Sequence, residues 1–357
     1  MIKKTQKLLA PVLCPAGKIY GSVMGMRSKM YAKGTFSRFD PECPCVSVGN
    51  IGSGGSGKTP LSGWLLDWAL SQGLAPALLS RGYRAAPPKL PYLVKPESPV
   101  QEAGDEPLML AIEHPGAKIV VDPVRIRSAS WVTRHYGPGI FILDDGFQHL
   151  AVRRDFDMVL LTPEDIESGW NRVIPRGTWR EGVKALNRAD IFLIKCRPFL
   201  FDEMREEIKN RLQKFKKPVF QFSLKPRALR RLGGRETRPG LNESYILVSG
   251  VGNPEQLEVT ANLFMGRSAE EHVIFKDHHS YTRDDIAAIR RTASHCGVRE
   301  IICTPKDAVK LKGLGADDFW TFDLDIEFSR SIFFDGSEPE TFDSWWSLNR
   351  INRENRK

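Results

Sequence analysis

The stretch CVSVGNIGSGGSGKTP, residues 45–60, decides the fold. It joins a short apolar segment to a glycine-rich turn and then to a helix-permissive run. The turn, residues 52–59, satisfies the pattern G-x4-G-K-[ST], which is typical of a phosphate-binding loop when it follows a strand and precedes a helix. The sequence therefore predicts a phosphate site at the start of a helix. The alternative is a glycine-rich turn with a chance lysine.

The residues of this loop have separate roles. Its glycines allow backbone N–H groups to converge on phosphate oxygens at a helix N-terminus, where the partial positive charge favours an anion. The Lys58 ammonium is expected to bridge the β- and γ-phosphates of a nucleotide, and the Thr59 hydroxyl to bind Mg²⁺. The predicted nucleotide-binding residues are Gly52, Ser53, Gly54, Gly55, Ser56, Gly57, Lys58 and Thr59.

A second feature is the run IFILDD, residues 140–145. Four apolar residues that lead into two aspartates are typical of a buried strand that ends at the carboxyl edge of a parallel sheet, where ligands bind in such folds. We predict that Asp144 and Asp145, together with Thr59, bind the metal of a nucleoside triphosphate. The alternative is that the two carboxylates only cap the following turn.

Short apolar segments alternate with helix-permissive ones, a pattern that predicts an α/β fold with a doubly wound parallel sheet. The expected strands are 45–48, 75–79, 118–121, 139–143, 157–161 and 191–195, and the expected helices are 59–71, 123–135 and 202–215. The alternation resumes with strands at 245–249, 273–275, 299–304 and 320–322 and helices at 254–263 and 283–295. A second, smaller α/β domain is therefore expected.

A basic stretch that contains glycine and proline, KPRALRRLGGRETRPG at 225–240, separates the two series of strands. This composition favours a linker or a hairpin. The predicted organisation is a basic N-terminal segment at 1–39, the P-loop domain at 40–224, a linker or hairpin at 225–243, the smaller domain at 244–336 and a C-terminal tail at 337–357. The tail contains two tryptophans and is expected to be a docked helix with a frayed end.

The positive charge is concentrated at the N-terminus. The formal net charge is +9, and residues 1–39 hold eight Lys and Arg residues and no carboxylate, so the rest of the chain is nearly neutral. This distribution argues against a nucleic-acid-binding protein and favours a local anionic partner. Apolar residues interleaved with these cations predict a helix that lies on a membrane surface with anionic lipids. The alternative is a helix packed on the domain with a solvated basic face.

Cysteine usage and the first apolar run bear on the compartment. The six cysteines are scattered and form no C-x2-C pair, which gives no support for a zinc ribbon or a disulfide scaffold and fits a reducing cytosol. The apolar run at 8–13 is shorter than the roughly 20 residues that a spanning helix needs. Prolines interrupt it and Lys18 follows it, which also disfavours a signal peptide.

Further motifs occur along the chain: VGNIG leading into the P-loop at 48–60, LSRGY at 79–83, GDEP at 104–107, DDGFQH at 144–149, RE at 180–181, DHHSY at 277–281 and TPKDAVKL at 304–311. In this combination and order the sequence resembles the tetraacyldisaccharide 4'-kinases, the lipid A pathway enzymes of Gram-negative bacteria. The resemblance extends from the N-terminal segment to about residue 311. The turn PRGTW at 175–179 and the tail beyond about residue 335 depart from the family pattern.

The resemblance implies transfer of the γ-phosphate of ATP, with Mg²⁺, to the 4'-hydroxyl of a tetraacylated glucosamine disaccharide 1-phosphate. It also implies an enzyme that is peripheral, or monotopic, on the cytoplasmic face of the bacterial inner membrane. The expected partners are the lipid substrate and the anionic membrane surface, with no nucleic acid and no obligate protein partner.

A sugar hydroxyl is a poor nucleophile at neutral pH, so a group that accepts its proton assists its attack. Asp105 in the GDEP turn and His278 after Asp277 are candidates by residue type, although a single histidine is often structural and His279 is a second imidazole. The resemblance implies a dyad in which His278 orients Asp105. With Lys58, these are the predicted catalytic residues.

Three more residues are predicted at the site. Arg81 and Arg125 are candidates for binding the 1-phosphate because the guanidinium fork binds phosphate with two hydrogen bonds. The resemblance implies that Glu181 lies near the metal. For all three, the alternative is an ordinary surface or interdomain ion pair.

A different class of function shares the P-loop. A P-loop GTPase, or an ATPase of the metallochaperone type, would hydrolyse its nucleotide to change the conformation of a partner. The chain has no N-K-x-D motif that reads guanine. The GDEP and DHH motifs also have no role in such proteins, so the kinase interpretation is favoured.

Overall fold

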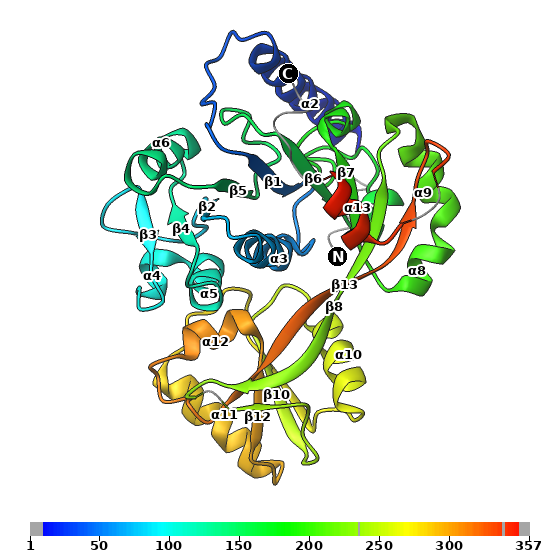
Figure 1. Ribbon diagram of the computed structural model, residues 1–357. Coiled ribbons are helices and arrows are strands. Elements are labelled where there is room, and N and C mark those ends of the chain that lie inside the picture. The colour runs from blue at the N-terminus through cyan, green and yellow to red at the C-terminus, as the bar shows by residue number, and fades with distance from the viewer. Residues whose placement is uncertain (1–9, 235, 338–339, 350–357) are drawn as a thin grey trace.

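One continuous sheet runs through both lobes of the molecule (Figure 1). The computed structural model describes residues 10–234, 236–337 and 340–349. Within them, a 13-stranded sheet has the order β11-β10-β12-β13-β8-β7-β6-β1-β5-β2-β4-β3, and β9 pairs with β8. The predicted α/β class is confirmed, and the two predicted series of strands share this sheet.

The first lobe carries the P-loop. Its parallel strands are β1 (Cys45–Asn50), β2 (Pro76–Ser80), β4 (Lys118–Val121), β5 (Ile140–Asp144), β6 (Phe156–Leu161) and β7 (Ile191–Lys195), and β3 (Tyr92–Val94) is antiparallel at the edge. Its connections contain α3 (Lys58–Ser71), α4 (Val100–Ala103), α5 (Asp105–Glu113), α6 (Arg125–Tyr136), α7 (Pro163–Ile166), η1 (Val183–Arg188), α8 (Pro198–Glu203), α9 (Arg205–Leu212) and η2 (Gln213–Phe215). The helix expected at 202–215 is thus divided into three pieces.

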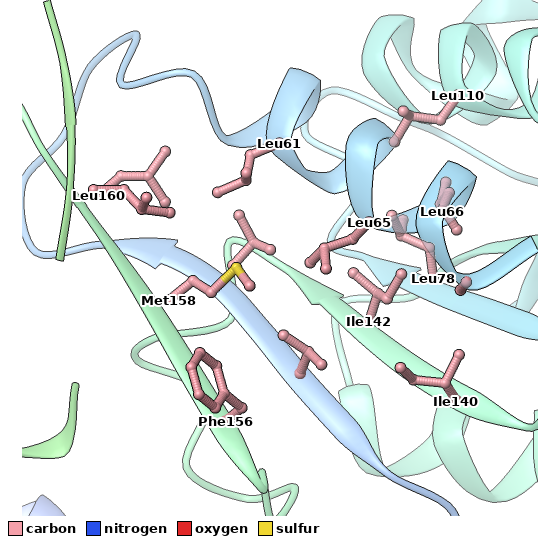
Figure 2. Close-up of a cluster of buried hydrophobic side chains, with 14 of the residues drawn as sticks. Leu61, Leu65, Leu66, Leu78, Leu110, Ile140, Ile142, Phe156, Met158 and Leu160 are labelled. Atoms are coloured by element: carbon pink, nitrogen blue, oxygen red, sulfur yellow. The ribbon is translucent and has the colours of Figure 1, made fainter. Parts of the chain in front are cut away.

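Apolar side chains fill the space between α3 and the sheet (Figure 2). Leu61, Leu65 and Leu66 of α3 belong to one cluster with Ile142 of β5 and Met158 of β6, and all five are fully buried. Burial of each such side chain contributes about 1.5–3 kcal/mol. Because α3 begins at the P-loop, this packing fixes the loop against the carboxyl edge of the sheet.

The second lobe repeats the same layout on a smaller scale (Figure 1). Its parallel strands are β10 (Tyr245–Ser249), β11 (Glu271–Ile274) and β12 (Glu300–Cys303), and its helices are α10 (Pro254–Met265), α11 (Arg283–His295) and α12 (Pro305–Leu311). Helix α12 contacts α5 of the first lobe. That contact brings the two lobes together beside the P-loop.

Two long antiparallel strands, β8 (Val219–Arg231) and β13 (Trp320–Ile332), connect the lobes. The boundary predicted at residue 225 therefore falls inside β8, and only the part after β8 forms a hairpin, with β9 (Thr237–Arg238). The stretch was interpreted as a linker because the carboxylates that face its basic residues lie on β13, far away in sequence. Lys225 pairs with Glu327 at 3.3 Å, and Arg227 pairs with Asp323 at 2.9 Å. The first part of the basic stretch is thus a strand whose positive charges are neutralised by carboxylates of β13.

The C-terminal tail folds back onto the first lobe. Helix α13 (Phe342–Asn349) follows β13, and the side chains of Phe342, Trp345 and Trp346 are buried in the same cluster as the α3 leucines. The docked helix predicted in this tail is present at 342–349. Residues 350–357 lie outside the described residues.

The N-terminal segment forms one helix, α2 (Ala10–Ala32), on the outside of the first lobe (Figure 1). Its Arg27 donates a hydrogen bond to the carbonyl of Gln148 at 3.1 Å, and Arg188 donates to Ser28 at 3.3 Å. Among the described helices, none combines the length and the apolar character needed to span a membrane. Residues 1–9 of the predicted segment lie outside the described residues.

We predict that Trp346→Ala lowers the free energy of unfolding by about 3–5 kcal/mol because it removes a buried aromatic ring and leaves a cavity. The ring of Trp346 lies 5.2 Å from that of Trp68 and 5.5 Å from that of Phe156. Urea denaturation measures the effect. Leu348 on the same helix is 77% exposed, and Leu348→Ala is the control, with an expected change of roughly 0.5 kcal/mol or less. Equal losses in both variants would contradict a docked α13.

Candidate active site

The P-loop lies between β1 and α3 with its tip open to solvent. Gly54 and Gly57 have φ angles of 133° and 90°, a conformation that side chains disfavour. Gly57 precedes α3 directly, and a Cβ there would lie 3.0 Å from the ring of Phe222 and 3.1 Å from Lys195. The loop therefore needs glycine both for its conformation and for its close approach to neighbouring side chains.

Lys58 and Asp145 lie together at the carboxyl edge of the sheet. Nζ of Lys58 is 3.6 Å from Oδ1 of Asp145, and Arg180 donates to Oδ2 at 2.8 Å. Burial acts to raise the pKa of Asp145, but Lys58 and Arg180 outweigh it and hold the pKa below its usual value. Asp145 is therefore a carboxylate at neutral pH.

Asp144 lies deeper, at the end of β5. Its carboxylate accepts hydrogen bonds from Ser62 of α3 at 3.1 Å and from Ser80 of β2 at 3.3 Å. Burial raises the pKa of Asp144 to about 6, and the nearby carboxylates of Glu106 and Asp145 act in the same direction. A buried carboxylate with this environment is well placed to gain from a cation beside it.

Thr59 of the P-loop is connected to the second lobe through Glu106. Its hydroxyl donates to Oε2 of Glu106 at 2.5 Å, and the Glu106 carboxylate also pairs with Lys306 of α12. Burial acts to raise the pKa of Glu106, but Lys306 and Thr59 lower it overall. Sequence reasoning missed Glu106 and Lys306, although the second carboxylate of GDEP and the lysines of TPKDAVKL were available as signals.

The structure brings Asp105 and His278 together across the lobes. Asp105 is the first residue of α5, and Nδ1 of His278 is 3.0 Å from its Oδ2. His278 has a φ of 59°, and its ring lies 5.4 Å from that of Tyr83. The second imidazole is engaged elsewhere, because His279 contacts Asp285 at 3.1 Å and stacks on a phenylalanine within its own lobe. The geometry therefore favours His278 over His279 as the partner of Asp105.

Arg125 is placed differently from its predicted role. It is only 2% exposed, and its guanidinium donates to the carbonyls of Asp122 at 2.6 Å and Asp144 at 3.2 Å. Burial lowers its pKa to about 10. Arg125 thus supports the end of β5, and its burial argues against direct phosphate binding. Arg81 is exposed in the loop after β2 and keeps its predicted access to a ligand.

Glu181, predicted to lie near the metal, pairs with Arg188 instead. Arg188 donates to both of its carboxylate oxygens, at 2.7 and 3.0 Å, and the pair is largely buried. Arg188 contacts α2 as well, through Ser28. This arrangement matches the alternative of an ion pair, and it joins the RE motif to the N-terminal helix.

Arginines gather around His149 of the DDGFQH motif. Burial lowers the pKa of His149 to about 3, and the positive charges of Arg125, Arg81 and Arg27 act in the same direction. The imidazole is therefore neutral, while the surrounding charge favours an anion. Arg27 was not predicted at this site, because its position on α2 places it far from the motif in sequence.

Comparison with known proteins identifies the family. The family model described as Tetraacyldisaccharide-1-P 4'-kinase matches residues 9–335. The tetraacyldisaccharide 4'-kinase of Nitratidesulfovibrio vulgaris is 44% identical over 350 residues, which are 98% of this chain and 97% of that protein. The enzyme of the same name from Oleidesulfovibrio alaskensis is 47% identical over 347 residues, 96% of this chain and 95% of that protein.

A solved structure supports the same assignment. It is described as the "apo" form of LpxK from Aquifex aeolicus in complex with ATP, with a TM-score of 0.70 and 26% identity. The match covers 91% of this chain and 96% of that one. The chain therefore belongs to the tetraacyldisaccharide 4'-kinase family and is an ATP-dependent kinase.

Proposed function

We propose that this kinase transfers the γ-phosphate of ATP to the 4'-hydroxyl of a tetraacylated glucosamine disaccharide 1-phosphate on the cytoplasmic face of the bacterial inner membrane. The observation that carries the proposal is the contact of Asp105 with His278 beside the P-loop, where the adjacent Glu106 accepts a hydrogen bond from Thr59. A carboxylate oriented by an imidazole next to the phosphate site suits proton removal from an acceptor hydroxyl.

The residues divide the work of the transfer. P-loop N–H groups hold the phosphates, and Lys58 offsets negative charge as the bond to the β-phosphate oxygen breaks. The substrate hydroxyl oxygen attacks the γ-phosphorus while Asp105 accepts the hydroxyl proton on its carboxylate. His278 keeps the carboxylate oriented, and ADP leaves. Positioning of this kind supplies much of the rate enhancement in phosphoryl transfer.

Thr59 at the start of α3 and the two aspartates at the end of β5 fit Mg²⁺ as part of the ATP complex. The Thr59 hydroxyl and the carboxylates of Asp144 and Asp145 are hard oxygen donors, and Mg²⁺ commonly takes one or two carboxylates together with substrate phosphates. The described residues contain no cluster of three or more Asp, Glu, His or Cys able to hold a metal without the nucleotide. Bound Mg²⁺ supplies charge neutralisation on the phosphates. Because Glu181 forms an ion pair with Arg188, we omit Glu181 from this site.

Helix α2 supports membrane attachment. Ile19, Val23 and Met26 are each more than half exposed, and Val23, Met26, Arg27, Met30, Tyr31 and Phe36 line a shallow pocket. An apolar surface beside arginines suits acyl chains next to anionic headgroups. Because Arg27 also contacts the DDGFQH loop, a lipid on α2 would have its phosphorylated sugar close to the charge cluster around His149. We propose Arg81 and Arg27 for its 1-phosphate.

A transfer assay tests the function. Purified protein is incubated with γ-labelled ATP, Mg²⁺ and the tetraacylated disaccharide 1-phosphate, and the products are separated by thin-layer chromatography. We expect label in the lipid. Label only in free phosphate would instead support the alternative, a hydrolysing P-loop GTPase or ATPase.

We predict that Asp105→Asn lowers kcat at least 100-fold because the amide cannot accept the hydroxyl proton. The affinity for ATP, measured by calorimetry, should change less than twofold, since the P-loop is intact. Asp284→Asn, at an exposed position of α11, is the control and should match wild type. Full transfer activity in Asp105→Asn would exclude this residue as the base.

We also predict that Ile19→Ser combined with Met26→Ser reduces sedimentation with vesicles that contain anionic lipid and raises KM for the lipid. The two side chains are 67% and 60% exposed, so the change removes apolar surface without opening a core. Leu263→Ser on α10, at a side chain that is 70% exposed, is the matched control. Equal vesicle binding by wild type and the α2 variant would contradict attachment through this face.

A further inference from the structure

Lys310 is a buried cation of the second lobe that faces the candidate base of the first. Its side chain is 5% exposed. Nζ lies 2.8 Å from Oδ1 of Asp307 and 3.7 Å from Oδ2 of Asp105. Placing an ammonium group in such an environment is costly unless carboxylates compensate it. Lys310 therefore depends on both aspartates, one in each lobe.

Asp307 contacts both Lys310 and Gly250, and Gly250 in turn contacts the loop that carries His278. It is fully buried, and its Oδ2 accepts hydrogen bonds from the N–H of Gly250 at 2.9 Å and from the Thr304 hydroxyl at 2.6 Å. The carbonyl of Gly250 in turn accepts from the N–H of His278 at 3.2 Å.

Gly250 lies in close contact with Asp307 and with the Tyr281 hydroxyl. A Cβ on Gly250 would lie 3.1 Å from Oδ1 of Asp307 and 3.3 Å from the Tyr281 hydroxyl. A side chain at position 250 would require Asp307 or its neighbours to move by a few tenths of an ångström. The two groups of the second lobe that face Asp105 are thus fixed relative to each other.

Both groups face the same oxygen of Asp105. Nδ1 of His278 is 3.0 Å from Oδ2, and Nζ of Lys310 is 3.7 Å from the same atom. Neither the hydrogen bond from His278 nor the ion pair with Lys310 is formed at Oδ1 in the described contacts. A rotation of the carboxylate would exchange the two oxygens. The imidazole and the ammonium together favour the orientation that leaves Oδ1 open.

We propose that Lys310 is a positioning residue for phosphoryl transfer, which with His278 holds Oδ2 of Asp105 and leaves Oδ1 to accept the proton of the substrate hydroxyl. The inference rests on the proposed function. Because Lys310 and His278 belong to the second lobe, Asp105 has this orientation only while the lobes are in contact. The competing explanation is that Lys310 serves solely as the counter-ion of Asp307.

The first experiment measures steady-state kinetics of full-length Lys310→Met with ATP and the lipid acceptor. We expect kcat to fall about 10- to 100-fold, the effect of a misplaced catalytic group, with KM for ATP within twofold of wild type. Lys312→Met, at an exposed lysine at the end of α12, should match wild type. A normal kcat in Lys310→Met would overturn the inference.

A second variant separates positioning from charge compensation. Lys310→Met leaves Asp307 buried without its counter-ion, which alone can prevent folding. Lys310→Met combined with Asp307→Asn removes both charges, and we expect it to fold, with a thermal melting temperature near that of wild type, and to retain the kcat defect. Recovery of wild-type kcat in the double variant would show that the lysine only compensates Asp307.

A third comparison tests whether Lys310 acts through Asp105. In an Asp105→Asn background, adding Lys310→Met should change the residual kcat less than twofold, because the carboxylate that it orients is gone. An undiminished effect there would overturn the inference. Wild-type protein that puts no label in the lipid would overturn the proposed function as well, whereas normal wild-type transfer with an unaffected Lys310→Met variant overturns the positioning role alone.

Discussion

The contact between two adjacent carboxylates of one lobe and the cations of the other is the constraint on which the site depends. Asp105 and Glu106 occupy the first turn of α5, where the helix dipole favours negative charge. They face Lys310 and Lys306, which are four residues apart and so lie on one side of α12. Each carboxylate also has a functional partner, His278 in one case and Thr59 in the other. Separating the lobes would therefore disrupt both the candidate base and the contact at the P-loop.

The continuous sheet fixes the relative position of the two lobes and so maintains that contact. Strands β8 and β13 pair from Arg231 opposite Trp320 in the second lobe to Val219 opposite Ile332 in the first. Two hydrogen-bonded strands restrict relative motion of the lobes far more than a flexible linker does. The exposed ion pairs along them contribute little stability individually, but the carboxylates of β13 neutralise the neighbouring positive charges of β8.

Local patterns allowed much of the fold to be predicted. Two strands were predictable because each is an apolar run that ends in candidate site residues: β1 leads into the P-loop, and β5 ends in Asp144. These two runs also located the edge of the sheet at which the nucleotide was expected. Strand β8 was misread because its partners on β13 lie about a hundred residues away. Residue type also says nothing about burial, which explains why Arg125 was assigned to a ligand although the protein itself engages it. Glu181 was placed near the metal by the resemblance alone, and in the structure it pairs with Arg188. Lys310 required the folded arrangement, since its distance to Asp105 depends on the docking of two lobes.

The N-terminal helix is connected to the phosphate site through the DDGFQH loop. Arg27 of α2 donates to the carbonyl of Gln148, and the Gln148 side chain donates to the carbonyl of Asn50 at 2.9 Å and accepts from Arg180 at 3.2 Å. Arg180 also donates to Asp145, so the helix lies three contacts from a proposed metal carboxylate. A side chain that hydrogen-bonds to the end of β1 and to Arg180 at once has little freedom to move independently. The proposed membrane surface and the proposed phosphate-transfer site are therefore parts of one hydrogen-bonded unit.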